Sequence, residues 1–115
     1  MMDYIGRNYD PSDYNCAHFL ADWYRDKLGI EIPTGSVWEL SFAVWLRRHF
    51  TEIPEPVENC VVLMTTFGMR HIGVYSRYGV YHNYRAGKSH GSVVHWELGL
   101  VKRNYQQVSF WQWSK

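Results

Sequence analysis

The sequence predicts an α+β domain in which N-terminal helices pack on a C-terminal antiparallel sheet of about five strands. Apolar residues recur with helical spacing as far as His49, and from Cys60 onward they recur with a period of two. The breaks between the C-terminal strands are short, which requires antiparallel pairing because a parallel crossover takes about a dozen residues or more. A chain of 115 residues without an internal repeat or a linker is expected to form one domain, residues 1–115.

The first helix is expected over residues 15–28, after a loop arm at residues 1–14. Gly29 follows it as the expected stop, because glycine readily adopts the left-handed conformation that ends a helix. Helical spacing places one set of apolar side chains on one face and three charged side chains on the other. The apolar face holds Cys16, Phe19, Leu20, Trp23 and Leu28, and the charged face holds Asp22, Arg25 and Asp26.

A second helix is expected from about Ser36 to His49. Ser36 and Glu39 form a capping box, in which each side chain binds a backbone N–H at the start of the helix. Arg47, Arg48 and His49 occupy the last turn, where cations complement the helix dipole. We interpret this basic run as a solvated helix end rather than as an anion site.

The C-terminal half is rich in β-branched and aromatic residues, which predicts strands. These strands are expected near residues 60–66, 70–76, 79–84, 91–97 and 106–113. Trp96, Trp111 and Trp113 fall on the strand patterns, so we expect them to be core or sheet-face residues.

Charge and composition exclude several classes of function. Twelve Lys and Arg against eleven Asp and Glu leave a net charge of +1, which provides no basic face for nucleic acid or for an anionic membrane surface. No apolar run approaches the ~20 residues of a membrane span, and the first residues do not resemble a secretion signal. The two cysteines make no disulfide framework, so a free Cys16 thiol in a reducing cytoplasm is expected.

Cys16 is the best candidate nucleophile in the chain. Asn15 can cap a helix that begins near Cys16, and the positive end of that helix lowers the pKa of a thiol. The free N–H groups of the first turn can also hold an oxyanion. The alternative is that Cys16 is a small, inert core residue, as free cysteines often are.

A thiol nucleophile needs a base, and the base needs an orienting partner. His71 and His82 lie on two strands joined by a short turn, so they can be cross-strand neighbours within hydrogen-bonding reach. If the helix that begins at Cys16 covers the same face, Cys16 becomes the nucleophile, His71 the base and His82 the orienter. The alternative is that both histidines are satisfied structural residues.

The remaining cysteine and histidines carry less chemistry. Cys60 opens a buried strand and is expected to be core. His90 and His95 are expected at the rim or in a loop. No Cys-x-x-Cys or His-x-x-x-His pairing appears in the sequence, so we expect no metal.

Four short motifs resemble those of the NlpC-type cysteine peptidases, which have a papain-like fold and cut peptide bonds of the bacterial cell wall. In chain order they are Tyr4 with Gly6, Asn15-Cys16-Ala17-His18, His71-Ile72-Gly73-Val74-Tyr75 and Tyr81-His82. The resemblance covers roughly residues 4–96. It implies that Cys16, His71 and His82 are catalytic, and that Tyr4 and Asn15 contact the oxyanion or substrate; a Tyr4 that only fastens the arm to the core is the alternative.

The chain departs from the family at Asn15, Ala17 and His18, where the family has Asp, Ser and Gly. Asn15-Cys16-Ala17-His18-Phe19 is similar instead to the signature of the lecithin-retinol acyltransferase-like relatives. Those enzymes are circularly permuted, with the histidine before the cysteine. Here Cys16 precedes His71, which is the order of the peptidases.

The resemblance implies a cysteine endopeptidase or amidase that cleaves peptidoglycan stem peptides without a cofactor. With no wall-binding domain or export signal seen in the sequence, the expected setting is a phage or phage-like tail component, made in the cytoplasm, with tail proteins as partners. Two alternatives stay open. One is a non-catalytic structural or adaptor module of a phage tail, and the other is a lipid acyltransferase or thioesterase.

Overall fold

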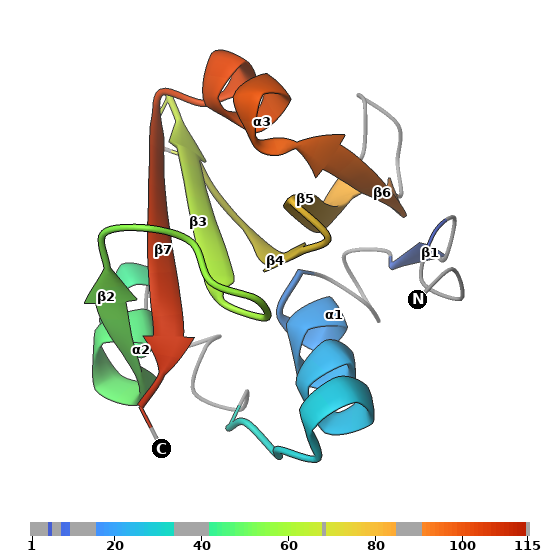
Figure 1. The fold of residues 1–115 in the computed structure, drawn as a ribbon, viewed down its shortest axis with the longest axis vertical. Coiled ribbons are helices and arrows are strands. Elements are labelled where there is room, and N and C mark those ends of the chain that lie inside the picture. The colour runs from blue at the N-terminus through green and yellow to red at the C-terminus, as the bar shows by residue number, and fades with distance from the viewer. Residues whose placement is uncertain are drawn as a thin grey trace.

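The computed structural model describes residues 5, 8–9, 16–33, 42–67, 69–84 and 91–114. Within these residues the chain forms three α-helices, one π-helical segment and seven strands (Figure 1). In chain order they are β1 (Asn8–Tyr9), α1 (Cys16–Trp23), η2 (Tyr24–Leu28), α2 (Phe42–His49), β2 (Phe50–Ile53), β3 (Val61–Thr66), β4 (Met69–Ser76), β5 (Gly79–Tyr84), β6 (Gly91–Glu97), α3 (Leu98–Asn104) and β7 (Gln107–Trp113).

The strands form one antiparallel sheet in the order β1-β6-β5-β4-β3-β7-β2. This confirms the predicted α+β class and antiparallel pairing, and the five expected strands correspond to β3 to β7. The predicted count of about five is too low for the described residues, because β1 and β2 extend the two edges of the sheet. Both are short, so their pairing with β6 and β7, rather than a local pattern, makes them strands.

The first helix extends to Leu28 as predicted, but its last turn is the π-helical segment η2. Phe19, Leu20 and Trp23 are buried as expected, whereas Leu28 is 40% exposed and Tyr24 is buried in its place. A π turn adds a residue to each hydrogen-bonded ring, so the apolar face rotates relative to a regular α-helix. The expected stop at Gly29 is confirmed, since its φ is 69° and its N–H donates to Arg25 O over 3.1 Å.

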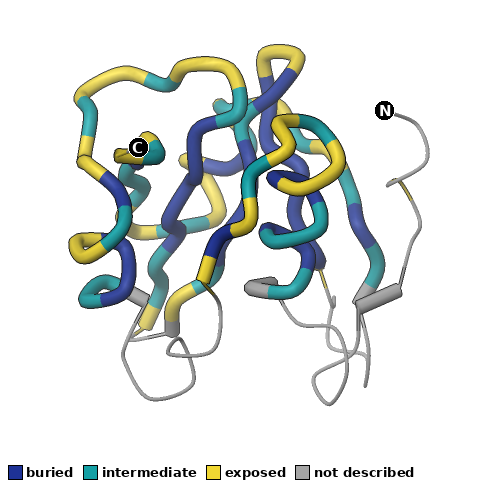
Figure 2. The backbone as a smooth tube through the Cα atoms, turned by 90° about the horizontal axis from the view of Figure 1, so that it is seen from below, coloured by how far each residue is buried: buried dark blue, intermediate teal, exposed yellow. Residues whose placement is uncertain are grey.

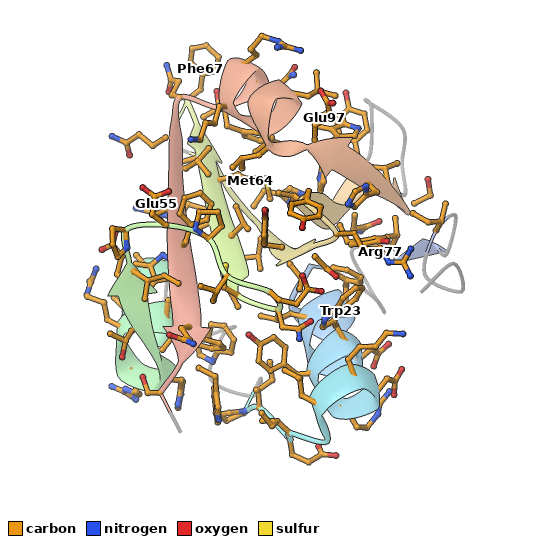
Figure 3. The ribbon with its side chains drawn as sticks, viewed as in Figure 1. Trp23, Glu55, Met64, Phe67, Arg77 and Glu97 are labelled. Carbon is orange, nitrogen blue, oxygen red and sulfur yellow. The ribbon has the colours of Figure 1, made fainter. Side chains whose placement is uncertain are left out.

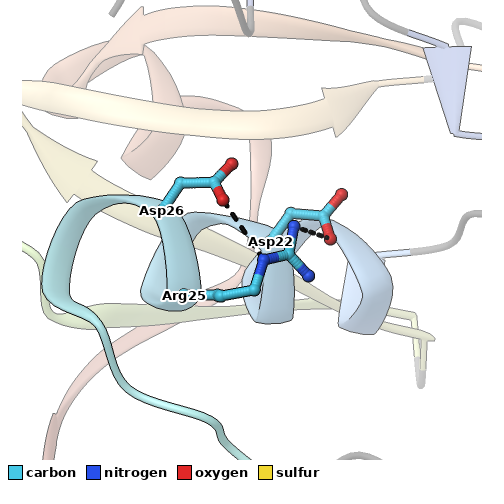
Figure 4. Close-up of polar contacts among 3 residues, drawn as sticks. All are labelled: Asp22, Arg25 and Asp26. Atoms are coloured by element: carbon cyan, nitrogen blue, oxygen red, sulfur yellow. Dashed lines mark hydrogen bonds and ion pairs between the residues drawn. The ribbon is translucent and has the colours of Figure 1, made fainter.

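The charged face of this helix lies at the surface, as predicted. Arg25 bridges Asp22 at 3.1 Å and Asp26 at 3.2 Å (Figure 4). The second helix is described from Phe42, and the predicted capping box at Ser36 and Glu39 lies outside the described residues.

The sheet is buried on both faces, and different helices cover them. The face toward α1, η2 and α2, here called the α1 face, carries Val61, Leu63, Ile72, Val74, Tyr81, Val93 and Trp111. The opposite face, the α3 face, carries Val62, Met64, Val80 and Phe110 beneath Val101 of α3. Figure 1 shows α3 and α1 on opposite sides of the strands, and Figure 2 shows buried residues along the strands with exposed residues in the turns.

Candidate active site

A tight hairpin of β4 and β5 builds the candidate site. Its turn residues Arg77 and Tyr78 have φ values of 56° and 63°, the positive values that a two-residue hairpin turn requires. Figure 3 shows Arg77 at this turn, well apart from Phe67, which marks the turn at the other end of β4. In the resulting register Gly73 pairs with His82, so His71 is the diagonal cross-strand neighbour of His82.

The structure brings the two predicted histidines together. His71 Nε2 lies 3.1 Å from His82 Nδ1, a hydrogen-bonding distance. Gly73 permits this close approach of the strands: a Cβ atom there would lie 2.7 Å from Tyr81 O and from Val80 Cγ1. Position 73 therefore has to be glycine for β4 and β5 to approach closely enough to pair His71 with His82.

Three aromatic side chains enclose the pair. His82 is fully buried and meets the ring of Trp96 edge to face, with ring centroids 4.7 Å apart and planes at 81°. Tyr84 lies 6.0 Å from His82 and 4.8 Å from Trp96. The half-buried ring of His71 stacks on Tyr105, at the end of α3, over 6.3 Å.

The sequence analysis did not connect these aromatic residues with the site. Trp96 lies on a strand, as predicted, and its pairing with Val80 places it on the same face as His82. That register was the missing information, because only the strands joined at Arg77-Tyr78 were paired from the sequence. Tyr105 carries no sequence signal for the site, since only the packing of α3 brings it to His71.

Burial makes both imidazoles poor proton acceptors from water. It lowers the pKa of His71 from the ordinary 6.5 to about 4. Burial, followed by the charges of His71 and His95, lowers the pKa of His82 to about 3. Both rings are therefore neutral at pH 7, and the site favours a neutral imidazole over a thiolate–imidazolium pair.

Cys16 is the first residue of α1, at the position that the sequence predicts for the nucleophile. Its side chain lies outside the described part of the structure, so no Cys16–His71 distance is available. Phe19, Leu20 and Trp23 of α1 pack on the α1 face, whereas the alternation of β4 and β5 places His71 and His82 on the α3 face. The packed side of the helix and the histidine pair thus occupy opposite faces of the sheet, so the condition for the predicted Cys16–His71 pairing, a helix over the face of His71, is not met.

The other predicted residues are distributed as follows. Tyr4, Asn15 and His90 lie outside the described residues. His95 is exposed on β6, and its Nε2 lies 3.0 Å from Ser76 O. Cys60 is 1% exposed, which confirms that it is core, and burial raises the pKa of its thiol.

No group of three His, Cys, Asp or Glu side chains among the described residues could hold a metal ion. None of the helices in the described ranges has the length and apolar character needed to cross a membrane.

Comparison of the chain with models of protein families, with curated proteins and with solved structures gave no match. The function is therefore argued from the geometry of the histidine pair and from the motifs in the sequence.

Proposed function

We propose that this domain is a thiol-dependent hydrolase that cleaves an amide bond in peptidoglycan stem peptides. The observation that carries the proposal is the hydrogen bond between His71 Nε2 and His82 Nδ1. It orients the His71 ring and leaves His71 Nδ1 without a partner among the described residues. The start of α1 at Cys16 supports the choice of nucleophile. The substrate class comes from the resemblance to the NlpC-type peptidases.

In the proposed reaction, His71 Nδ1 takes the proton of the Cys16 thiol while Sγ bonds to the carbonyl carbon of the amide. Free N–H groups at the start of α1, with Tyr4 and Asn15, stabilise the resulting oxyanion. His71 then gives its proton to the leaving nitrogen, and the C–N bond breaks to leave a thioester. Water, deprotonated by His71, attacks the thioester carbon and the C–S bond breaks. The acid leaves, and His71 returns its proton to Sγ of Cys16.

One feature of the fold favours a second candidate function. Because α1 packs on the face opposite His71, the packing of this helix does not by itself bring the thiol of Cys16 to His71. A domain in which the Cys16 thiol does not reach His71 would keep the fold without the activity. The second candidate is therefore a non-catalytic structural or adaptor module of a phage tail.

Digestion of purified muropeptides, followed by mass spectrometry, separates the candidates. We expect the wild-type domain to cut stem peptides, and Cys16→Ser and His71→Ala to lower kcat/KM by about 10³-fold or more, because each removes a reacting group. His82→Ala is expected to cost less, since His82 acts through His71. Cys60→Ala is the matched control, because it removes the other thiol and should retain activity.

Other results of the same experiments would contradict the proposed hydrolase. If no muropeptide is cut, and iodoacetamide alkylates Cys16 at the same rate in the wild type and in His71→Ala, the adaptor module is the better assignment. Incubation with labelled phospholipid tests the acyltransferase alternative in the same preparations. Transfer of an acyl group to Cys16 there, without muropeptide cleavage, would contradict the proposed peptidase.

The pH dependence of kcat/KM provides an independent check on the base. His71 is active when neutral, and a pKa of about 4 keeps it neutral above that pH. Between pH 7 and pH 5 we expect kcat/KM to change by less than about twofold on account of the base, whereas an imidazole with the ordinary pKa would lower it about 20-fold. A steep loss centred near pH 6.5 would show that His71 is solvated or is not the base.

A further inference from the structure

The second ring nitrogen of His82, Nε2, is buried and has no hydrogen-bond partner among the described residues. His82 as a whole is fully buried. The ring next to it is that of Trp96, which lies edge to face with the imidazole at 4.7 Å and 81°. The ring of Tyr84, which is partly exposed, packs against the same indole with centroids 4.8 Å apart.

The state of this nitrogen decides whether His71 can act as a base. Only one proton lies between His71 Nε2 and His82 Nδ1, and each neutral ring carries one N–H. If His82 is protonated at Nε2, its Nδ1 accepts from His71 Nε2–H, and His71 Nδ1 keeps a lone pair. In the reverse arrangement His71 Nδ1 carries the proton and cannot accept one from a thiol.

The enclosure by aromatic rings favours the first arrangement. The face of an indole is electron-rich, and an N–H that points at it makes a weak but real hydrogen bond. A bare lone pair at His82 Nε2 would instead be buried with no donor available among the described residues. The two rings lie edge to face at 81°, an angle at which an N–H···π contact can form.

We infer that Trp96 is a positioning residue: its ring accepts the Nε2–H of His82 and so selects the tautomer in which His71 Nδ1 can receive a proton. The effect of this tautomer on activity rests on the proposed thiol hydrolase, whereas the assignment of the tautomer does not depend on any activity. Trp96 touches neither the nucleophile nor the base in this scheme, and it acts through the His71–His82 hydrogen bond.

Long-range ¹H–¹⁵N correlation spectra of uniformly labelled protein at pH 7 test the inference directly, because protonated and unprotonated ring nitrogens have well-separated shifts. We expect His82 Nε2 and His71 Nε2 to be protonated in the wild type, and His82 Nδ1 and His71 Nδ1 to be bare. Trp96→Phe keeps an aromatic face and should keep this pattern. Trp96→Leu removes the face and should give averaged shifts from both tautomers.

The activity of the same variants gives a second measurement. Trp96→Leu should lower kcat about tenfold with little change in KM, and Trp96→Phe should restore most of the loss. Trp113→Leu, a tryptophan on the other face of the sheet, should leave the ¹⁵N pattern unchanged.

The two proposals fail in different ways. A wild-type spectrum with a proton on His71 Nδ1, or an unchanged pattern in a folded Trp96→Leu, overturns the role of Trp96 whatever the activity. If Trp96→Leu does not fold, the wild-type spectrum still tests the tautomer, and the spectrum of Trp96→Phe still tests whether an aromatic ring at position 96 keeps it. The expected tautomer in a protein that cuts no muropeptide supports the role of Trp96 and counts against the hydrolase.

Discussion

Acidification from pH 7 to pH 4 should lower the free energy of unfolding by roughly 3 kcal/mol through His82 alone. Above the ordinary pKa of 6.5 the histidine is neutral in both the folded and the unfolded chain, so its contribution to stability is fully present. Below 6.5 the unfolded chain binds a proton that the folded chain, with a pKa of about 3, does not bind. Stability is therefore lost steadily as the pH falls toward the folded value.

Urea denaturation at four pH values between 7 and 4 measures this loss. His82→Phe fills the same aromatic enclosure without a titrating group, so its stability should fall by roughly 3 kcal/mol less than that of the wild type over this range. Comparison of the two proteins at each pH cancels the contribution of the carboxyl groups. An identical pH dependence in both would mean that His82 is accessible to protons in the folded state.

Trp45→Ala should cost about 3–5 kcal/mol, because it removes a large side chain that is fully buried in the layer between α2 and the sheet. The indole packs on Phe50 with ring centroids 5.5 Å apart, and its Nε1 donates to Pro33 O over 2.7 Å. The substitution leaves a cavity and an unpaired Pro33 carbonyl in the core between α2 and the sheet. For a domain of this size such a loss is a large part of the total stability.

Thermal or urea denaturation followed by circular dichroism checks the cost. Trp45→Phe keeps most of the packing and loses the N–H, so it should cost about 1–2 kcal/mol. Phe67→Ala is the surface control, since Phe67 is 86% exposed and its loss should change stability by less than about 0.5 kcal/mol. A Trp45→Ala variant as stable as this control would mean that α2 does not pack as described.

Elements whose signals are local could be predicted from the amino-acid sequence alone. The turn at Arg77-Tyr78 sets the β4–β5 register, and that register makes His71 and His82 neighbours before any other contact is known. Gly29 ends the first helix for the same kind of reason, since its conformation depends on its own backbone. In each case a single residue or a short turn supplies the constraint.

Features that depend on contacts distant in the sequence, such as which helix residues are buried and where edge strands form, were predicted incompletely. The π turn of η2 buries Tyr24 rather than Leu28, and the Tyr24 hydroxyl donates to Asn59 O in the segment before β3. The edge strands β1 and β2 form because β6 and β7 offer free backbone groups to pair with. Neither feature has a periodic signal of its own.

The helix that covers the histidine pair could not be predicted from the sequence. A period of two places His71 and Ile72 on opposite faces of β4, but both faces of this sheet are apolar, as the fully buried run Val61–Met64 of β3 shows. Alternation therefore could not reveal whether α1 packs on His71 or on Ile72. In the structure, the apolar residues of α1 pack on the face that carries Ile72. The end of α3, with Tyr105, lies on the other face, next to His71.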